Sequence, residues 1–337
     1  MKVIKYFNFI IVLFLISSCG ADKMKDVDVS VVNVDLKIHR LDKDMFVQKD
    51  AEIVKNSLAY SKKYGVFYER YIQELLKLNS INDPMLESNV ELFIRNKDMR
   101  EVYNTIDKEF SDINWLKKDL TEAFKHYKYY YPDSLIPEIA LFMSGLNYPN
   151  AASDSVLGIG LDMYLGSDVS FYKLIGLPQY KIQVMRREYI LPDAIKSWLI
   201  SESEYDANNQ DMLSQIIFQG KILYMADVIL PEVEDSLKIC YTNDQLNWCA
   251  KNEGSIWAHV IDNKLLFSSS EKDISKLMND GPFTPGLPRE SPGRVGVWLG
   301  WQIVKAYMDK QQKIDLIALS KISPQEILQE SKYKPKI

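Results

Sequence analysis

The sequence has few of the side chains from which metal centres and nucleophilic active sites are built. Its 337 residues include three histidines and three cysteines. No two histidines lie close together in the chain, and none belongs to an H-E-x-x-H motif, which places two zinc ligands on one helix face. The G-x-S-x-G turn, the P-loop and the Rossmann glycine motif are missing as well. The sequence therefore predicts no catalytic residue, no metal site and no cofactor.

An excess of positive charge is also missing. Lysine and arginine number 41 against 46 aspartates and glutamates, which gives a formal net charge of −5. Surfaces that bind nucleic acid need clustered positive charge, so we expect no nucleic-acid partner. Hydrophobic residues make up 47% of the chain, which is enough to bury a large core in one or two domains.

The N-terminus has the features of an exported bacterial lipoprotein. Lys2 and Lys5 precede an apolar run over residues 7–16, and two serines then lead to Cys19. The run is shorter than the ~20 residues of a membrane span and is typical of a signal peptide. The order resembles a lipobox, so we predict a signal peptide over residues 1–18 and a lipid on Cys19 after cleavage. An ordinary signal or anchor with an unrelated cysteine is the alternative.

The predicted lipid sets the domain organisation and the location. Residues 19–28 are expected to form a lipidated tether, followed by a single domain over residues 29–337. Cleavage removes two lysines and no acid, so the exported chain has a net charge of −7. Acyl chains on one residue hold a protein stably at a membrane. We expect an anchor in the cell membrane or outer membrane. Because no acidic cluster of the kind that directs some lipoproteins to the cell surface follows Cys19, we expect the domain to face the periplasm.

The spacing of apolar residues predicts an α+β fold that is mostly helical, with one small antiparallel or mixed sheet. Strict alternation over residues 32–39 predicts a half-exposed strand, and two short apolar runs, 136–150 and 155–166, predict the rest of the sheet. Helical periodicity covers most of the remaining chain. The predicted helices span residues 51–65, 67–78, 84–94, 99–113, 115–130, 181–198 with a break at Pro192, 210–229, 244–253, 271–278, 292–308 and 314–332.

Several polar side chains lie in apolar stretches, where burial would leave them in need of partners. They either serve as structural partners of one another or line a pocket. The pocket candidates are Asp162, Arg186, Glu188, Asp193, Gln219, Lys221, Glu253 and Trp257. One alternative function is a hydrolase that uses Asp162, Glu188, or Glu253 with His259.

A second alternative function is a glycan binder. Four tryptophans that lie in one region of the sequence would form its aromatic platform, although core packing is the more common role of such residues. These are Trp248, Trp257, Trp298 and Trp301.

Two cysteines besides Cys19 remain to be placed. Cys240 and Cys249 flank an Asn-Asp turn, and an exported compartment permits a disulfide. The sequence leaves open a disulfide between them or two buried free thiols, because it does not fix the distance between their Cα atoms.

The combination of several long motifs resembles the gliding motility lipoprotein family GldB of Bacteroidota, from the signal peptide to the end of the chain. The motifs are GIGLDMYLG, QGKILYMADVILP, NEGSIWA, ESPGRVGVWLGWQIVKAYM and ESKYKPK. The resemblance implies a cell-envelope lipoprotein required for gliding, which contacts the membrane through its lipid. It further implies a non-catalytic role, in which the protein binds envelope proteins of the gliding or secretion machinery.

A weaker resemblance, over residues 158–308, is to a family of predicted zinc peptidases. It implies a zincin-like scaffold, in which one helix carries H-E-x-x-H and a later helix carries a glutamate ligand. Here Asp193 and Ser197 stand where the histidines belong, and Gln219 stands in place of the glutamate. Serine and glutamine cannot complete a zinc site, so the resemblance implies a degenerate, catalytically dead peptidase. A metal-dependent peptidase is kept as the alternative.

The stretch SPGRVGVWLGWQIVKAYM concentrates glycine in an apolar helix. Its apolar part, residues 295–304, is too short for a membrane span of ~20 residues. The spacing of Gly293, Gly296 and Gly300 places all three on one face and predicts close packing against the helices that correspond to the peptidase site. Pro292 is expected to begin the helix, and Arg294 is expected to be free to reach a partner.

Overall fold

The computed structural model describes residues 24–47, 53–153, 155–203, 211–311 and 314–335. The predicted signal peptide and Cys19 lie outside these residues. In the described part of the chain, no helix combines the length and the apolar character that crossing a membrane requires.

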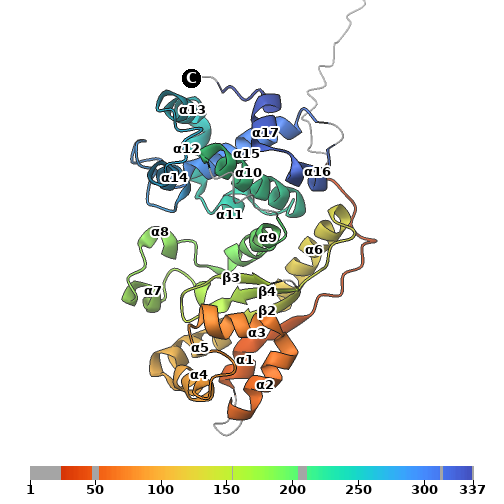
Figure 1. The fold of residues 1–337 in the computed structure, drawn as a ribbon, viewed down its shortest axis with the longest axis vertical. Coiled ribbons are helices and arrows are strands. Elements are labelled where there is room, and N and C mark those ends of the chain that lie inside the picture. The colour runs from red at the N-terminus through yellow and green to blue at the C-terminus, as the bar shows by residue number, and fades with distance from the viewer. Residues whose placement is uncertain (1–23, 48–52, 154, 204–210, 312–313, 336–337) are drawn as a thin grey trace, which may run out of the picture.

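A small mixed sheet lies at the centre of the fold, as predicted (Figure 1). Its strands are β1 (Ile38–Arg40), β2 (Glu138–Phe142), β3 (Asn150–Ser153) and β4 (Val156–Gly160), in the order β1-β2-β4-β3. β1 and β4 pair parallel with β2, and β3 pairs antiparallel with β4. All five residues of β4 are buried, because helices cover both faces of this strand.

The first strand is shorter than the alternation over residues 32–39 predicts. Residues 31–37 do alternate between exposed and partly or fully buried positions, but only Ile38–Arg40 pair with β2. Alternation reports which side chains face the core, whereas a strand also needs a neighbouring chain for its hydrogen bonds.

Helices from the first part of the chain cover one face of the sheet (Figure 1). Apart from α1, which is not predicted from the sequence, they correspond to the predicted helices over residues 51–113, although the segment predicted to begin at residue 67 continues as a π-helical turn. Asn96 caps α5 by accepting hydrogen bonds from the backbone of Asp98 and Met99. The elements are α1 (Leu41–Phe46), α2 (Ile53–Tyr64), α3 (Val66–Arg70), η1 (Tyr71–Leu75), α4 (Leu86–Arg95) and α5 (Lys97–Glu109), with α6 (Asn114–Tyr130) leading back to the sheet.

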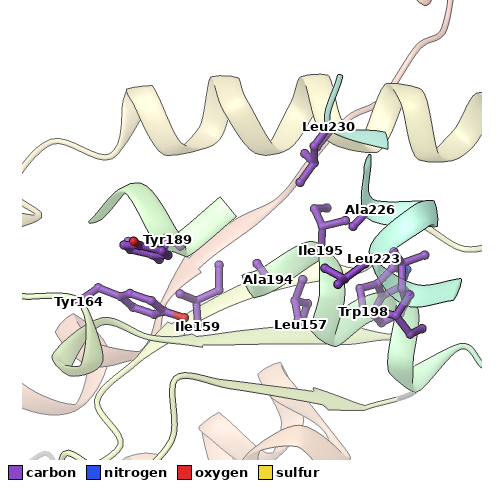
Figure 2. Close-up of a cluster of buried hydrophobic side chains, with 14 of the residues drawn as sticks. Leu157, Ile159, Tyr164, Tyr189, Ala194, Ile195, Trp198, Leu223, Ala226 and Leu230 are labelled. Atoms are coloured by element: carbon purple, nitrogen blue, oxygen red, sulfur yellow. The ribbon is translucent and has the colours of Figure 1, made fainter. Parts of the chain in front are cut away.

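The other face of the sheet is covered by α9 (Ile190–Ser201), and α10 (Met212–Ile229) packs on α9 (Figures 1 and 2). Figure 2 shows Ala194, Ile195 and Trp198 of α9 on the β4 side of the sheet, with Leu223 of α10 next to them. Trp198 is 1% exposed, so this contact closes the core between the sheet and the helical half.

Helices from the C-terminal part of the chain pack around α10 and α15 (Val295–Met308). The sequence predicts α14 (Glu271–Met278) with its observed bounds, but misses α7 (Ser170–Leu174) and α13 (Glu253–Asp262). The predicted tail helix is divided into α16 (Leu316–Lys321) and α17 (Pro324–Ser331), with Ser323 as the N-cap of α17. The short elements are η2 (Leu161–Met163), α8 (Gln179–Ile182), η3 (Arg187–Tyr189), α11 (Asp235–Ile239) and α12 (Asn243–Lys251).

Pro192 does not break a helix over residues 181–198. It lies in the first turn of α9, where a backbone N–H has no partner inside the helix and proline is therefore tolerated. The preceding residues form α8 and η3 as separate short elements.

The structure separates the three glycines that the sequence places on one face. α15 begins at Val295, so Gly293 and Pro292 lie before the helix, and Gly293 packs against the backbone of Gly281. Gly296 faces Met278 of α14, whereas Gly300 faces the backbone of α10. Of the three, only Gly293 lies outside the helix, whereas Gly296 and Gly300 are one turn apart on the same face of α15 and approach two different helices there.

The described end of the predicted tether is attached to the domain. Lys25 forms an ion pair of 2.6 Å with the buried Asp227, and the backbone carbonyl of Met24 accepts a hydrogen bond from Tyr130. Asp227 also pairs with Lys238 at 2.5 Å. The chain after residue 23 is thus fixed between α6 and α10.

Candidate binding pocket

A pocket of about 870 Å³ opens where α9, α10 and the loops around α11 meet. Further walls come from the start of β3, the segment around α8 and η3, and the loop before α15. Because α9 is amphipathic, one side of it enters the core while the other side reaches the pocket. The pocket side carries Asp193, Lys196, Ser197 and Ile200, at the i, i+3, i+4 and i+7 spacing of one helix face.

An ion pair occupies the middle of this face. Lys196 Nζ lies 3.0 Å from Asp193 Oδ1, and the other oxygen, Asp193 Oδ2, accepts a hydrogen bond of 3.2 Å from the hydroxyl of Tyr164. Asn150 Nδ2 donates in turn to that hydroxyl at 3.0 Å. Burial opposes the charge of Lys196, but the nearby Cys240 and Asp193 outweigh it and raise the lysine pKa. The lysine is thus held in its charged form.

Cys240 completes this cluster from the end of α11. Its sulfur lies 3.5 Å from Lys196 Nζ and 3.5 Å from Asp193 Oδ1. Burial, and then the charge of Asp193, raise the pKa of the thiol, so Cys240 is protonated at neutral pH. Its backbone is left-handed, with φ of 58°, a conformation that non-glycine residues seldom adopt outside special sites.

Arg294 forms the wall opposite α9 and also has a left-handed backbone, with φ of 54°. Nε lies 3.1 Å from Asp280 Oδ1, and Nη2 donates a hydrogen bond of 2.6 Å to the carbonyl of Ile239. The expectation that Arg294 is free is therefore wrong. The guanidinium is fixed by two loops that converge on the start of α15.

Three polar groups in the pocket have hydrogen-bonding capacity left over. Asn150 Oδ1 is buried, and nothing in the described part of the chain donates to it. The side chains of Ser197 and Gln219 also make no hydrogen bond with another described residue. Buried polar groups seldom stay without partners, so Asn150 Oδ1 is suited to a donor on a ligand, and the partly exposed Ser197 and Gln219 add groups that can donate and accept.

Three of the eight pocket candidates line this pocket, namely Arg186, Asp193 and Gln219. Ser197, which the peptidase resemblance pairs with Asp193, also lines it. The two helices that carry these residues pack directly on each other, which brings the positions together.

The other candidates have structural contacts elsewhere or lie at the surface. Asp162 is fully buried and accepts hydrogen bonds from Ser144 and from the backbone of Leu146, which ties the loop after β2. Lys221 donates to the carbonyls of Ser320 and Ile322, and burial lowers its pKa to about 8. Glu188 is exposed on η3 and does not line the pocket.

The last two candidates, Glu253 and Trp257, pack against the C-terminal tail. The hydroxyl of Tyr333 donates to Glu253 Oε1 at 2.5 Å, and the rings of Tyr333 and Trp257 meet edge to face. Trp298 and Trp301 are 4% and 1% exposed, and none of the four tryptophans proposed as a glycan platform lines the pocket. All four tryptophans pack in or against the hydrophobic core.

Both cysteines are free thiols in the structure, but only Cys249 is buried, whereas Cys240 is partly exposed. Cys249 is buried in α12, and burial raises its pKa to about 12. Within the described ranges, no group of three or more His, Cys, Asp and Glu side chains could hold a metal ion.

Sequence reasoning missed Lys196, Cys240, Arg294, Tyr164 and Asn150 as pocket residues. For Lys196 a signal exists, because it follows Asp193 by three residues and shares its helix face. For the other four, no local sequence pattern predicts that they lie close together in the pocket.

Fold and pocket together define an α+β domain, mostly helical, whose pocket is lined by charged and hydrogen-bonding side chains. The sequence model of the gliding motility protein GldB family matches residues 22–335, so the chain belongs to this family of gliding motility proteins. No curated protein and no solved structure matches the chain.

Proposed function

We propose that this gliding motility protein is a lipid-anchored component of the cell envelope that acts by binding a partner in the pocket rather than by catalysis. Membership of the GldB lipoprotein family supports the role in gliding and the lipid anchor. The domain is proposed to face the periplasm, and the partner to be an envelope protein of the gliding or secretion machinery.

The state of the pocket's reactive groups carries the proposal that binding replaces catalysis. A general base needs a carboxylate or amine that is free to take a proton, and a cysteine nucleophile needs a thiolate. Asp193 and Lys196 neutralise each other at 3.0 Å, and the raised pKa of Cys240 keeps its thiol protonated. Such a cluster favours recognition of a ligand over its chemical conversion.

We propose further that the scaffold is related to the zinc peptidases and that its site is degenerate. Support comes from the placement of Asp193, Ser197 and Gln219, which line one pocket from α9 and α10. A hydroxyl and a neutral amide are poor partners for zinc compared with imidazole and carboxylate. Metal analysis of the purified exported form tests this point. Zinc bound in equal amount to protein, with peptidase activity that a chelator removes, would instead support the metal-peptidase alternative.

Replacement of the chromosomal copy in a gliding bacterium tests the function. Deletion should abolish spreading of colonies. Ser197→Trp should do the same while leaving protein abundance unchanged, because the new side chain fills the pocket from its rim. The matched control is Leu92→Gln on α4, which changes a 70% exposed residue outside the pocket and should spread normally. Normal spreading by a stable Ser197→Trp protein would refute binding in the pocket.

A further inference from the structure

We infer that the pocket recognises a peptide segment through a carboxylate, either an acidic side chain or the C-terminal carboxylate of the partner. This inference rests on the proposed binding function and names the chemistry of the ligand at the same pocket.

The first argument is the charge of the pocket. Its lining includes five lysines and arginines but only two aspartates, in a chain whose net charge is −5. The cations are Lys181, Arg186, Lys196, Lys238 and Arg294, and the acids are Asp193 and Asp280. A pocket with an excess of positive charge attracts anions, also in a protein whose net charge is negative.

The second argument concerns which cations are available. Lys238 pairs with the buried Asp227, and Lys196 pairs with Asp193. Lys181 and Arg186 have no carboxylate within ion-pair distance among the described residues. Arg186 donates through Nε to the carbonyl of Gln183 at 3.1 Å, and its guanidinium lies over the ring of Tyr189, which is also a pocket residue. None of these contacts supplies a carboxylate, so the positive charge of Arg186 is not neutralised by them.

Arg294 adds a cation of fixed orientation. Its Nε and Nη2 are bound at 3.1 Å and 2.6 Å, while Nη1 has no partner in the described chain. Its acid partner Asp280 is 54% exposed, so the pair is open to solvent on one side. A ligand carboxylate can therefore accept a charge-assisted hydrogen bond from Nη1.

The third argument selects a peptide as the carrier of the carboxylate. Asn150 Oδ1 needs a donor, while Ser197 and Gln219 can each donate and accept. A peptide backbone supplies both kinds of group at regular spacing. The pocket is far larger than a phosphate ion, and apolar lining residues such as Leu177, Val184 and Leu223 suit peptide side chains.

The experiment uses the full exported protein and a library of acetylated hexapeptides, synthesised with free and with amidated C-termini. Enrichment of Asp and Glu among amidated peptides would identify a side-chain carboxylate, whereas binding confined to free acids would identify the C-terminus. In either case, Lys181→Gln combined with Arg186→Gln should weaken binding by about tenfold, as expected for loss of charge-assisted contacts. Lys118→Gln, an exposed change on α6 outside the pocket, should leave binding unchanged.

Both substitutions lie on exposed or half-exposed positions, so the double variant is expected to fold. Arg294→Lys provides a second variant, which keeps the charge and removes the planar fork, and it should also weaken binding. Selection of neutral or basic peptides, absence of peptide binding, or equal binding by the double variant would overturn the inference. The proposed function would fail separately, through normal spreading of the Ser197→Trp strain.

Discussion

Gly220 of α10 and Gly300 of α15 lie backbone to backbone where the two longest buried helices of the C-terminal half cross. A Cβ atom on Gly220 would overlap the carbonyl group of Gly300, and a Cβ atom on Gly300 would overlap the carbonyl oxygen of Ile216. Backbone atoms on both sides cannot rotate away, so each glycine is required by the close approach of the other helix.

Alanine at either position should therefore destabilise the domain. Gly300→Ala and Gly220→Ala would each gain up to about 1 kcal/mol of helix propensity, but overpacking of about 1–3 kcal/mol should outweigh this gain. Gly296→Ala is the comparison, because the shortest contact of its Cβ would be with the flexible side chain of Met278, and the backbone oxygen of Leu277 is 3.0 Å away, so the cost should be smaller. Chemical denaturation measures all three. Variants at Gly300 and Gly220 that are as stable as the native protein would contradict the packing described.

The buried carboxylate of Asp227 should make a large contribution to stability. Its partners are Lys238 at 2.5 Å, Lys25 at 2.6 Å and Lys305 at 3.8 Å, and its own side chain is not exposed. Asp227→Asn would leave Lys238, only 2% exposed, without its buried counter-charge. We expect a loss of about 3–5 kcal/mol in the free energy of unfolding, measured with denaturant at pH 7.

The same contribution should depend on pH. Burial alone would raise the pKa of Asp227, but Lys238 and Lys25 outweigh it and lower the pKa below the ordinary 3.8. A carboxyl whose pKa is lower in the folded state stabilises above its unfolded pKa, and the effect is lost as pH falls through the folded value. The stability difference between native protein and Asp227→Asn should be constant above pH ~5 and should shrink below pH ~4. If this stability difference instead grew as the pH fell, the pKa of Asp227 would be raised in the folded state, which would contradict the prediction.

Asp162 should stabilise the loop that forms part of the pocket rim. It receives hydrogen bonds from Ser144 and Leu146, and the neighbouring Leu146 and Asn147 line the pocket. Asp162→Ala would leave buried donors unpaired and should cost about 2–4 kcal/mol. Asp168→Ala, which removes an exposed carboxylate nearby in the chain, is the control and should change stability little. Equal effects of the two substitutions on the melting temperature would show that Asp162 has no such role.

Cys240 should react slowly with thiol reagents despite its place in a pocket. Because burial and Asp193 raise its pKa above 9.0, little thiolate is present at neutral pH. In a protein with Cys19 and Cys249 replaced by serine, alkylation at pH 7.5 should be slower than that of free cysteine. Lys196→Met should slow it further, because Lys196 is among the groups that lower the cysteine pKa. Fast alkylation at neutral pH would indicate a thiolate and would reopen a nucleophilic role.

The fold class was predictable because it depends on local patterns. Helical periodicity predicted the bounds of α14, and short apolar runs between turn residues predicted the sheet. The mixed pairing, with β3 as an antiparallel edge strand, depends on contacts between distant segments and needed the structure.

The pocket was predictable only where one helix face carries it. Asp193 lies on α9 and Gln219 lies on α10, and the periodicity of apolar residues in the sequence predicts a helix at both positions. Cys240 and Arg294 line the pocket from left-handed backbone positions. Neither residue type favours this conformation, so the sequence does not predict it. Glu253 and Trp257 were misplaced because the distant tail folds back and Tyr333 packs on them.

Site-specific photo-crosslinking in gliding cells tests the central claim most directly. A photoreactive residue at Gln183, on the exposed rim of the pocket, should capture a discrete envelope protein, whereas the same residue at Lys118 on α6 should not. The captured species should disappear when Ser197→Trp fills the pocket and spreading is lost. Capture that persists unchanged in the Ser197→Trp strain, or no capture from Gln183 in cells that glide, would contradict binding of a partner in this pocket.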